Sequence, residues 1–296
     1  MTIEKQARTT LTAVEMDQDD ELRFTLACGA TRRIRLLGAS AAIYESNLST
    51  LPEPGHRARV VLRMTCRLEI DGHPVTLVRW VGTQDSFYEP WELFGMRLWF
   101  DGCSALFDHL KEDHGACRPR KQVRLALQDA SLRICPVLLH PWCPLRPQGL
   151  RIEDCYQGAD CWMGPYFGAS AHGGLDINHP AGTPIWTPIA FDDHGLFNSV
   201  AAGDNNNRWR GRRRWSDGST WILQVHHLVR LLVPEGGGLD AGIHLADAAG
   251  VWVGSHEHSH FVFGLIEPGA PDDHKILLDP WILFWQMLQD RRQTTR

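Results

Sequence analysis

Alternating apolar and polar positions are the strongest local pattern in the chain, and they predict a β-hairpin between residues 62 and 81. From Leu62 to Ile70 every second residue is apolar, and the residues between them are polar or charged. Asp71-Gly72 follows, and the segment 75–81 is again rich in β-branched and apolar residues. An Asp-Gly pair between two such runs favours a tight turn, so we expect a hairpin with one buried and one solvated face.

Similar patterns predict further strands and two helices. Short strand-like pieces occupy residues 22–26, 33–37 and 123–127. The stretch from 101 to 114 has helical apolar spacing and is bounded by glycines, which predicts a helix. The stretch from 280 to 292 also predicts a helix, because Pro280 suits a first turn.

These elements predict a mostly β protein in four parts. Residues 1–20 are polar and are expected to form a disordered tail. Residues 21–130 are expected to form a β-rich accessory domain. Residues 131–163 combine cysteines, prolines and tryptophans, which is typical of an ordered connection. Residues 164–296 carry short strand candidates between turn residues, which predicts a compact all-β unit ending in the helix.

Composition narrows the class of protein. The 296 residues carry a formal net charge of −5, which gives no sign of nucleic-acid binding. The chain has no apolar run long enough to span a bilayer, and its first 20 residues lack the apolar centre of a signal peptide. We therefore expect a cytoplasmic protein, or one exported by another route. Without a signal sequence, the eight cysteines are expected to be reduced thiols, although a disulfide framework is the alternative.

Three histidines at every second position carry the most distinctive chemistry. In a strand, His256, His258 and His260 would project from one face, roughly 6–7 Å apart from one to the next. Such a row could bind a metal ion with one imidazole and act on a substrate with its neighbour.

Two other segments could complete a metal site. His172 and Asp176 would lie about 13 Å apart in a flat strand, but Gly173 and Gly174 allow a bend that brings them together. His226 and His227 would point to opposite faces of a third strand, 221–233. Two imidazoles, one carboxylate and a water form an open zinc site.

These segments resemble the motifs of lysostaphin-type (LytM-like) zinc endopeptidases. His172-Gly-Gly-Leu-Asp176 with the following Gly-Thr-Pro resembles the family's first motif, His227-Leu228 its internal element, and His258-Ser-His260-Phe261 its terminal His-x-His-Phe. The three motifs occur in the family's order over about residues 164–265. The resemblance implies an antiparallel β-sheet metallopeptidase domain of lysostaphin/LytM type behind the accessory domain.

The resemblance also implies roles for individual residues. His172, Asp176 and His260 would bind Zn²⁺, and His227 and His258 would be the catalytic histidines. Family members hydrolyse peptide bonds in bacterial peptidoglycan, in the periplasm or outside the cell. The chain departs from the family before the last motif, where residues 249–258 replace the usual run ending in Gly-Pro-His. Because that run shapes the substrate groove, the departure leaves the substrate open.

Other polar residues are weaker candidates. The arginine-rich stretch with Arg208 and Arg210 either grips an anionic substrate or forms a solvated hairpin tip. His256 is expected at the rim of the site, as a further substrate-binding residue. His179, His194 and His244 are expected at the surface or in loops.

Two other functions remain possible from the sequence. One is a catalytically silent zinc-binding activator or cell-wall-binding module on the same fold. The other is a cupin-like metal oxygenase, whose histidine pair would precede a distant glutamate and histidine. The reversed order of motifs in this chain disfavours it.

Overall fold

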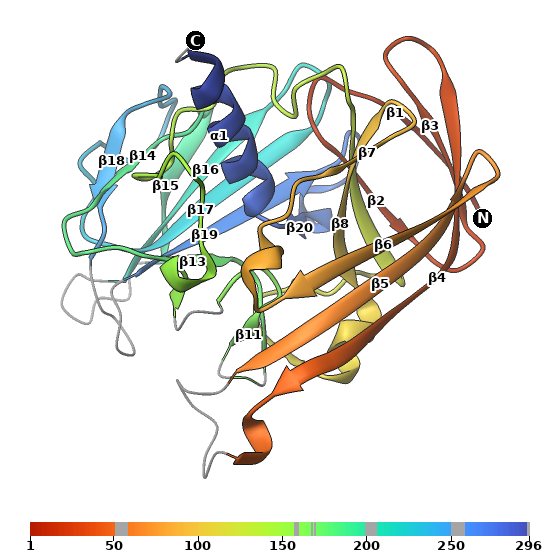
Figure 1. Cartoon of the computed structure of the whole chain (residues 1–296). Helices are drawn as coiled ribbons and strands as arrows, with labels where there is room; N and C mark the ends of the chain where they lie inside the picture. The colour runs from red at the N-terminus through yellow and green to blue at the C-terminus, as the bar shows by residue number, and fades with distance from the viewer. Residues whose placement is uncertain are drawn as a thin grey trace. The chain divides into compact units, whose positions relative to one another are not determined.

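The computed structural model describes residues 1–50, 59–156, 160–166, 168, 170–198, 206–249 and 258–294. Most of its regular structure is β-strand, and the described residues contain a single α-helix, α1 (Trp281–Thr294) (Figure 1). The strand neighbours are antiparallel in all but two pairs. The expectation of a mostly β protein and the C-terminal helix are both confirmed.

The chain divides into two compact units. The first is formed by Met1–Pro136 and Met163–Gly173, and the second by Val137–Trp162 and Gly174–Arg296. Residues 137–162 thus belong to the second unit, where the sequence predicted a connection over 131–163. Trp142 and Trp162 in this stretch are buried, which explains why its described residues pack closely despite the prolines.

The first unit contains three sheets. The five-stranded sheet has the order β1 (Thr2–Gln6), β3 (Glu21–Thr25), β4 (Thr31–Ser46), β5 (Val60–Ile70) and β6 (His73–Val81). The four-stranded sheet has the order β2 (Thr12–Met16), β10 (Val123–Asp129), β8 (Met96–Cys103) and β7 (Trp91–Leu93). The three-stranded sheet has the order β11 (Pro165–Tyr166), β12 (Ser170–His172) and β9 (Lys111–His114).

The predicted hairpin is formed by β5 and β6, which pair from Leu62 opposite Val81 to Ile70 opposite His73. Burial alternates along most of β5, as the apolar pattern requires. The turn residues Asp71 and Gly72 both have positive φ, +49° and +83°, which suits a tight turn of the type that matches strand twist. The local sequence therefore specifies this hairpin almost completely.

Two sequence-based expectations in this unit are wrong. Residues 1–20 are no disordered tail, because they form β1 and β2, and β2 pairs with β10. Residues 101–114 are no α-helix: β8 runs to Cys103, the 3₁₀ helix η3 (Ser104–Asp108) follows, and then β9. In both cases pairing with a strand distant in sequence outweighs the local pattern, since β10 binds β2 on one side and β8 on the other.

The second unit is built on a six-stranded sheet. Its order is β13 (Leu175–Asn178), β19 (His258–Ile266), β17 (Thr220–Leu228), β16 (Asn207–Arg214) and β15 (Asp193–Asn198), with β20 (Ile276–Leu278) also paired to β19 (Figure 1). A two-stranded sheet joins β14 (Pro184–Trp186) and β18 (His244–Asp247). Phe284 of α1 lies against Trp142 and Phe261, with ring centroids 5.9 and 5.3 Å away, so the helix covers part of this core.

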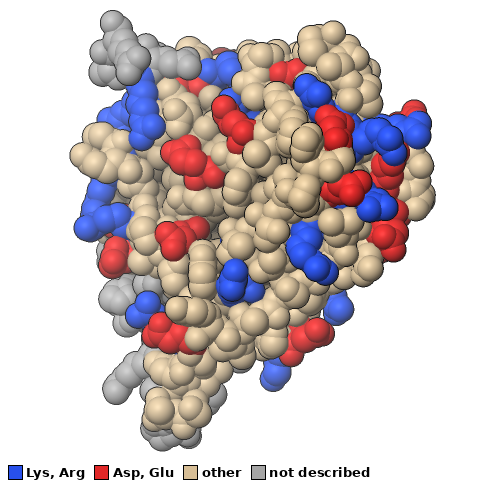
Figure 2. Space-filling view, turned by 45° about the vertical axis from the view of Figure 1, so that its right-hand side comes forward, with Lys and Arg blue, Asp and Glu red and all other residues tan. Residues whose placement is uncertain are grey.

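Figure 2 shows basic and acidic side chains interspersed over the described residues of one face. All eight cysteines are free thiols, and seven of them are buried. Within the described part of the chain, α1 is too short and too polar to cross a bilayer, and no other helix could do so.

Candidate metal centre

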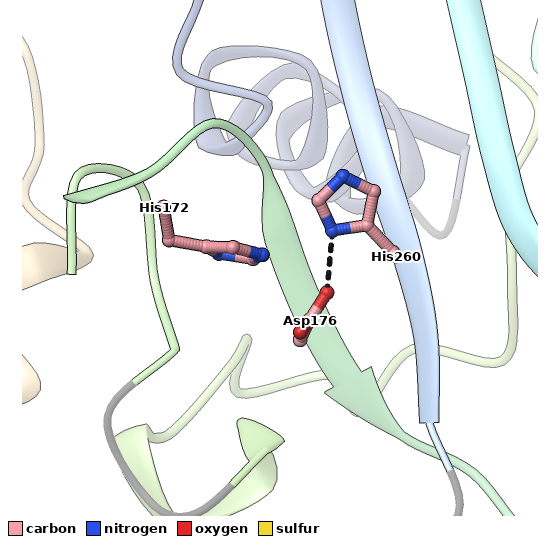
Figure 3. Close-up of side chains that lie close together, drawn as sticks. All are labelled: His172, Asp176 and His260. Atoms are coloured by element: carbon pink, nitrogen blue, oxygen red, sulfur yellow. Dashed lines mark hydrogen bonds and ion pairs between the residues drawn. The ribbon is translucent and has the colours of Figure 1, made fainter. Parts of the chain in front are cut away.

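Strands β13 and β19 bring a carboxylate and two imidazoles together. Their antiparallel register places Asp176 opposite His260 and Asn178 opposite His258. Directly paired residues share one face of a sheet, and so do alternate residues of one strand. His260 Nδ1 lies 2.7 Å from Asp176 Oδ1, and His258 Nε2 lies 3.7 Å from Asp176 Oδ2. Figure 3 shows the first of these pairs.

His172 joins this pair from four residues before Asp176. Strand β12 ends at His172 and β13 begins at Leu175, so the chain bends at Gly173-Gly174. The ligand atoms of His172, Asp176 and His260 all lie within 4.8 Å of one another (Figure 3). Within the described residues this is the one group of His, Cys, Asp and Glu side chains close enough to hold a metal ion.

Gly174 makes room for the His260 ring. A Cβ atom at position 174 would lie 2.3 Å from His260 Cε1 and 2.7 Å from both His260 Nε2 and the Phe261 carbonyl oxygen. These separations are shorter than any van der Waals contact allows, so the absence of a side chain here is a steric requirement. The glycine therefore positions a candidate ligand, besides allowing the bend.

A β-bulge brings both His226 and His227 to the same end of the sheet. Asn207 pairs with Leu228 and Trp209 with Val225, so His226 and His227 together lie opposite Arg208 alone. His227 has φ of +61°, a left-handed conformation that is unusual outside glycine. The His226 ring lies 4.5 Å from that of His260, and the His227 ring lies 4.6 Å from that of His258. The prediction that His226 and His227 point to opposite faces would hold in a regular strand. It is wrong here, because the bulge interrupts the alternation of side chains.

Asn206 fixes the orientation of His227. Its side-chain oxygen lies 2.9 Å from His227 Nδ1, and because an amide oxygen only accepts, Nδ1 carries the proton and Nε2 the lone pair. Burial, followed by the charge of His258, lowers the pKa of His227 to about 3. The imidazole is therefore neutral near pH 7, with its lone pair at Nε2. Sequence reasoning missed Asn206, which was visible only as part of the run Asn205-Asn-Asn207.

Two further residues near the group were also missed. Tyr156 stacks on His258 with ring centroids 4.1 Å apart. The backbone oxygen of Asp160 accepts a hydrogen bond of 3.0 Å from the Asp176 amide. Burial, reinforced by the charge of Asp176, raises the pKa of the Asp160 carboxyl well above its usual value. Both residues come from irregular segments, where no sequence periodicity points to them.

The donor set fits a zinc ion. Ligands of a four-coordinate zinc at about 2.0–2.1 Å are about 3.3 Å from one another, so a group within 4.8 Å needs only small side-chain shifts. Two imidazoles and one carboxylate leave a fourth position for water, which is the composition of an open site. His172 and Asp176 are buried, and His260 is partly exposed, so the group can be reached from solvent on the His260 side.

The weaker candidates fall in different places. Arg208 and Arg210 lie in strand β16, inside the sheet, and therefore neither in a loop nor at a hairpin tip. His256 lies outside the described residues. His244 is exposed and paired with Asp247, as expected of a surface histidine. His179 lies in the loop between β13 and β14, as expected, although it is buried. The expectation is wrong for His194, which is buried in β15, where Trp209 Nε1 donates a hydrogen bond to its Nδ1.

Comparison with known proteins identifies no family. No family model and no curated protein matches the chain. Among solved structures, the peptidase lysostaphin from Staphylococcus simulans is 17% identical with a TM-score of 0.31, covering 40% of this chain and 44% of its own. The M23 protein EnpA from Enterococcus faecalis has a TM-score of 0.28 at 17% identity, covering 49% of this chain and 89% of that catalytic domain. A zinc-containing peptidase from Vibrio cholerae has a TM-score of 0.26 at 11% identity, covering 85% and 81%. These values are too low to assign membership.

Proposed function

We propose that this chain is a zinc-dependent endopeptidase that hydrolyses peptide bonds, with peptides of bacterial peptidoglycan as the first substrates to test. The observation that carries the proposal is the group of His172, Asp176 and His260, with His258 beside Asp176 and the His227 ring beside that of His258. The order of these residues in the chain, which resembles the lysostaphin type, supports the same function. The name of lysostaphin as an antimicrobial peptidase guides the choice of substrates.

In this mechanism His172, Asp176 and His260 would hold the zinc ion. A bound zinc ion polarises the scissile carbonyl and lowers the pKa of a water to about 7. His227 accepts the proton of the attacking water at Nε2, because the Asn206 oxygen keeps the other proton on Nδ1. His258 stabilises the developing negative charge and delivers a proton to the leaving amine. Tyr156, stacked on His258, keeps that ring in place.

The test combines metal analysis with hydrolysis. We expect one zinc per chain by mass spectrometry, and cleavage of purified peptidoglycan or of Gly- and D-Ala-containing peptides detected by liquid chromatography. His260→Ala should lose both zinc and activity. His227→Ala should keep zinc and lose about 10²–10⁴-fold in kcat, the usual contribution of a general base. His244→Ala, an exposed histidine in the same unit, is the matched control and should keep both.

Two outcomes would contradict the proposal. One is a pure protein without stoichiometric zinc, and the other is unchanged hydrolysis in His260→Ala. Stoichiometric zinc with no turnover on any peptide, and with wall binding intact, would instead support a silent binding module. Iron in place of zinc would favour an oxygenase.

A further inference from the structure

The His258 ring lies just outside the candidate metal group. Its Nε2 is 3.7 Å from Asp176 Oδ2, but His258 is no member of the group, whose ligand atoms lie within 4.8 Å of one another. His258 and His260 alternate along β19, so both project from one face of the sheet, about 6–7 Å apart. Two imidazoles at this spacing can reach the same metal ion. His258 would therefore be a further ligand unless its ring is held elsewhere.

A further protein ligand would change the kind of metal site. Three protein ligands leave one position of a four-coordinate zinc ion for water, as in catalytic sites, whereas four protein ligands close the coordination sphere, as in structural sites. With His258 added to His172, Asp176 and His260, the ion would have no open position. His258 would also lose the nitrogen lone pair that proton transfer needs. The proposed function thus requires that His258 stay apart from the ion.

Two aromatic contacts hold the His258 ring. The Tyr156 ring is stacked on it, with centroids 4.1 Å apart and planes inclined by 27°. The His227 ring meets it at 62°, with centroids 4.6 Å apart. Only 5% of His258 and 1% of Tyr156 are exposed, so both rings are packed against other parts of the protein. A rotation of His258 toward the metal group would break the stacking with Tyr156.

The backbone around Tyr156 is tied to the strand that carries Asp176. Cys155, the residue before it, forms a β-bridge with β13, and the Asn178 side chain donates a hydrogen bond of 3.0 Å from Nδ2 to the Cys155 carbonyl oxygen. The Tyr156 carbonyl oxygen accepts a hydrogen bond of 3.1 Å from the Asp160 amide. The Asp160 carbonyl oxygen in turn accepts one of 3.0 Å from the Asp176 amide. Tyr156 is therefore anchored on both sides.

Asn178 is the side chain that makes this anchor. Its Nδ2 faces two carbonyl oxygens, of Cys155 at 3.0 Å and of Glu153 at 3.5 Å. Because a carbonyl oxygen only accepts, the NH₂ group of the amide must point to this segment. Asn178 also lies directly opposite His258 in the register of β13 and β19. The residue that faces His258 across the strand pair thus anchors the segment that carries Tyr156.

We propose that Tyr156, anchored by Asn178, is a positioning residue that prevents His258 from becoming a fourth protein ligand and so keeps the metal centre open. The proposal rests on the proposed function for the use of the open position, but the number of protein ligands can be measured without a substrate. Removing Tyr156 should tighten metal binding, because His258 then adds a ligand, while hydrolysis falls. A tyrosine that only fills space would weaken both when it is removed.

The test replaces zinc with Co²⁺, whose visible absorption depends on its ligands, and adds azide, an anion that takes an open position. In the wild type, azide should shift the cobalt spectrum. In Tyr156→Ala we expect this shift to be lost, and zinc affinity, measured by competition with a chromogenic chelator, to rise about tenfold or more. Asn178→Ala should change both readouts in the same direction and by less.

Two control variants isolate the stacking contact. Tyr156→Phe keeps the ring and should match the wild type in azide shift and zinc affinity. Trp186→Ala removes a half-buried aromatic residue that lies beside His140 and His244 in the same unit, 5.8 and 6.5 Å between centroids. It should also match the wild type in both readouts. Circular dichroism checks that each variant is folded, and if Tyr156→Ala is not, Asn178→Ala decides by the same two measurements.

The outcomes separate this proposal from the peptidase. Weaker zinc binding with the azide shift retained in Tyr156→Ala would overturn the positioning role, whether or not the wild type hydrolyses peptides. A wild-type cobalt spectrum that does not respond to azide would overturn it too, because the site would already be closed. Tighter zinc binding and a lost azide shift in Tyr156→Ala, with no hydrolysis by the wild type, would support the positioning role and contradict the peptidase.

Discussion

Gly174 shows how one residue controls the geometry of the candidate metal centre. The sequence singled it out for backbone freedom, because a glycine pair separates His172 from Asp176. The structure adds a second reason, which is the space that the His260 ring occupies against it. That reason depends on β13 pairing with β19, 84 residues later at the His260 position, so no local pattern reveals it.

Gly174→Ala is therefore expected to displace His260. A Cβ 2.3 Å from its Cε1 forces the ring or the strand to move, and overpacking of this kind is destabilising by about 1–3 kcal/mol. We expect zinc affinity to fall at least tenfold, measured by competition with a chromogenic chelator. Gly238→Ala is the control, because its Cβ would meet only the Phe191 carbonyl oxygen, at 3.5 Å. An unchanged zinc affinity in Gly174→Ala would contradict the steric role.

His179 illustrates a loop residue whose burial the sequence does not reveal. It lies between β13 and β14, in a loop as expected, yet only 6% of it is exposed. Burial, followed by the charge of His258, lowers its pKa to about 4. The buried imidazole is thus neutral in the folded state wherever an unfolded histidine, with a pKa near 6.5, would begin to bind a proton.

This shift predicts a dependence of stability on pH. Between pH 6.5 and about 4 the unfolded chain binds a proton at His179 that the folded chain does not. The contribution is complete above pH 6.5 and falls by at most about 1.4 kcal/mol per pH unit as the pH decreases. In urea unfolding with a chelator present, His179→Gln should flatten the curve in this window. Parallel curves for wild type and variant from pH 7 to 4.5 would contradict the prediction.

At the scale of elements, β2 and the bulge in β17 show where local pattern fails. Residues 17–20 are rich in Asp, which suggested a tail, but Asp20 binds Lys121 at 2.6 Å and the N-terminal amine at 2.8 Å. The charge of this segment predicts exposure to solvent, but these ion pairs hold Asp20 against other residues of the first unit. The bulge likewise follows from Asn207 and Leu228 pairing across one extra residue. Neither feature is encoded within a window of ten residues.

Truncation tests the first of these elements. Removing residues 2–16 deletes β2 and the buried Leu11, Val14 and Met16, each worth about 1.5–3 kcal/mol when fully buried. We expect the first unit to lose cooperative folding, seen as a lost unfolding transition and fast hydrogen exchange in β10. Removing only residues 2–7 deletes the half-exposed β1 and should be far milder. A variant without residues 2–16 that unfolds at the wild-type urea concentration would show β2 to be dispensable.

At the scale of the whole molecule, the sequence predicts the fold class better than it predicts where the compact units begin and end. A mostly β protein follows from short alternating runs between turn residues, and the structure confirms it. The two units, however, exchange segments along the chain, with 137–162 in the second and 163–173 in the first. Domains predicted as consecutive segments of the sequence miss this exchange, because each stretch is then grouped with its neighbours in the chain.

The sequence by itself determined the strands with clear alternation, the C-terminal helix and the residue types that can hold a metal, because these depend on side-chain chemistry and short-range periodicity. The tertiary structure alone decided which strands pair, and with that which side chains meet. It brought Asp176 to His260 and turned His227 toward His258 through a bulge. Hydrogen bonding between strands far apart in the chain sets each of these contacts, and no local window contains both partners.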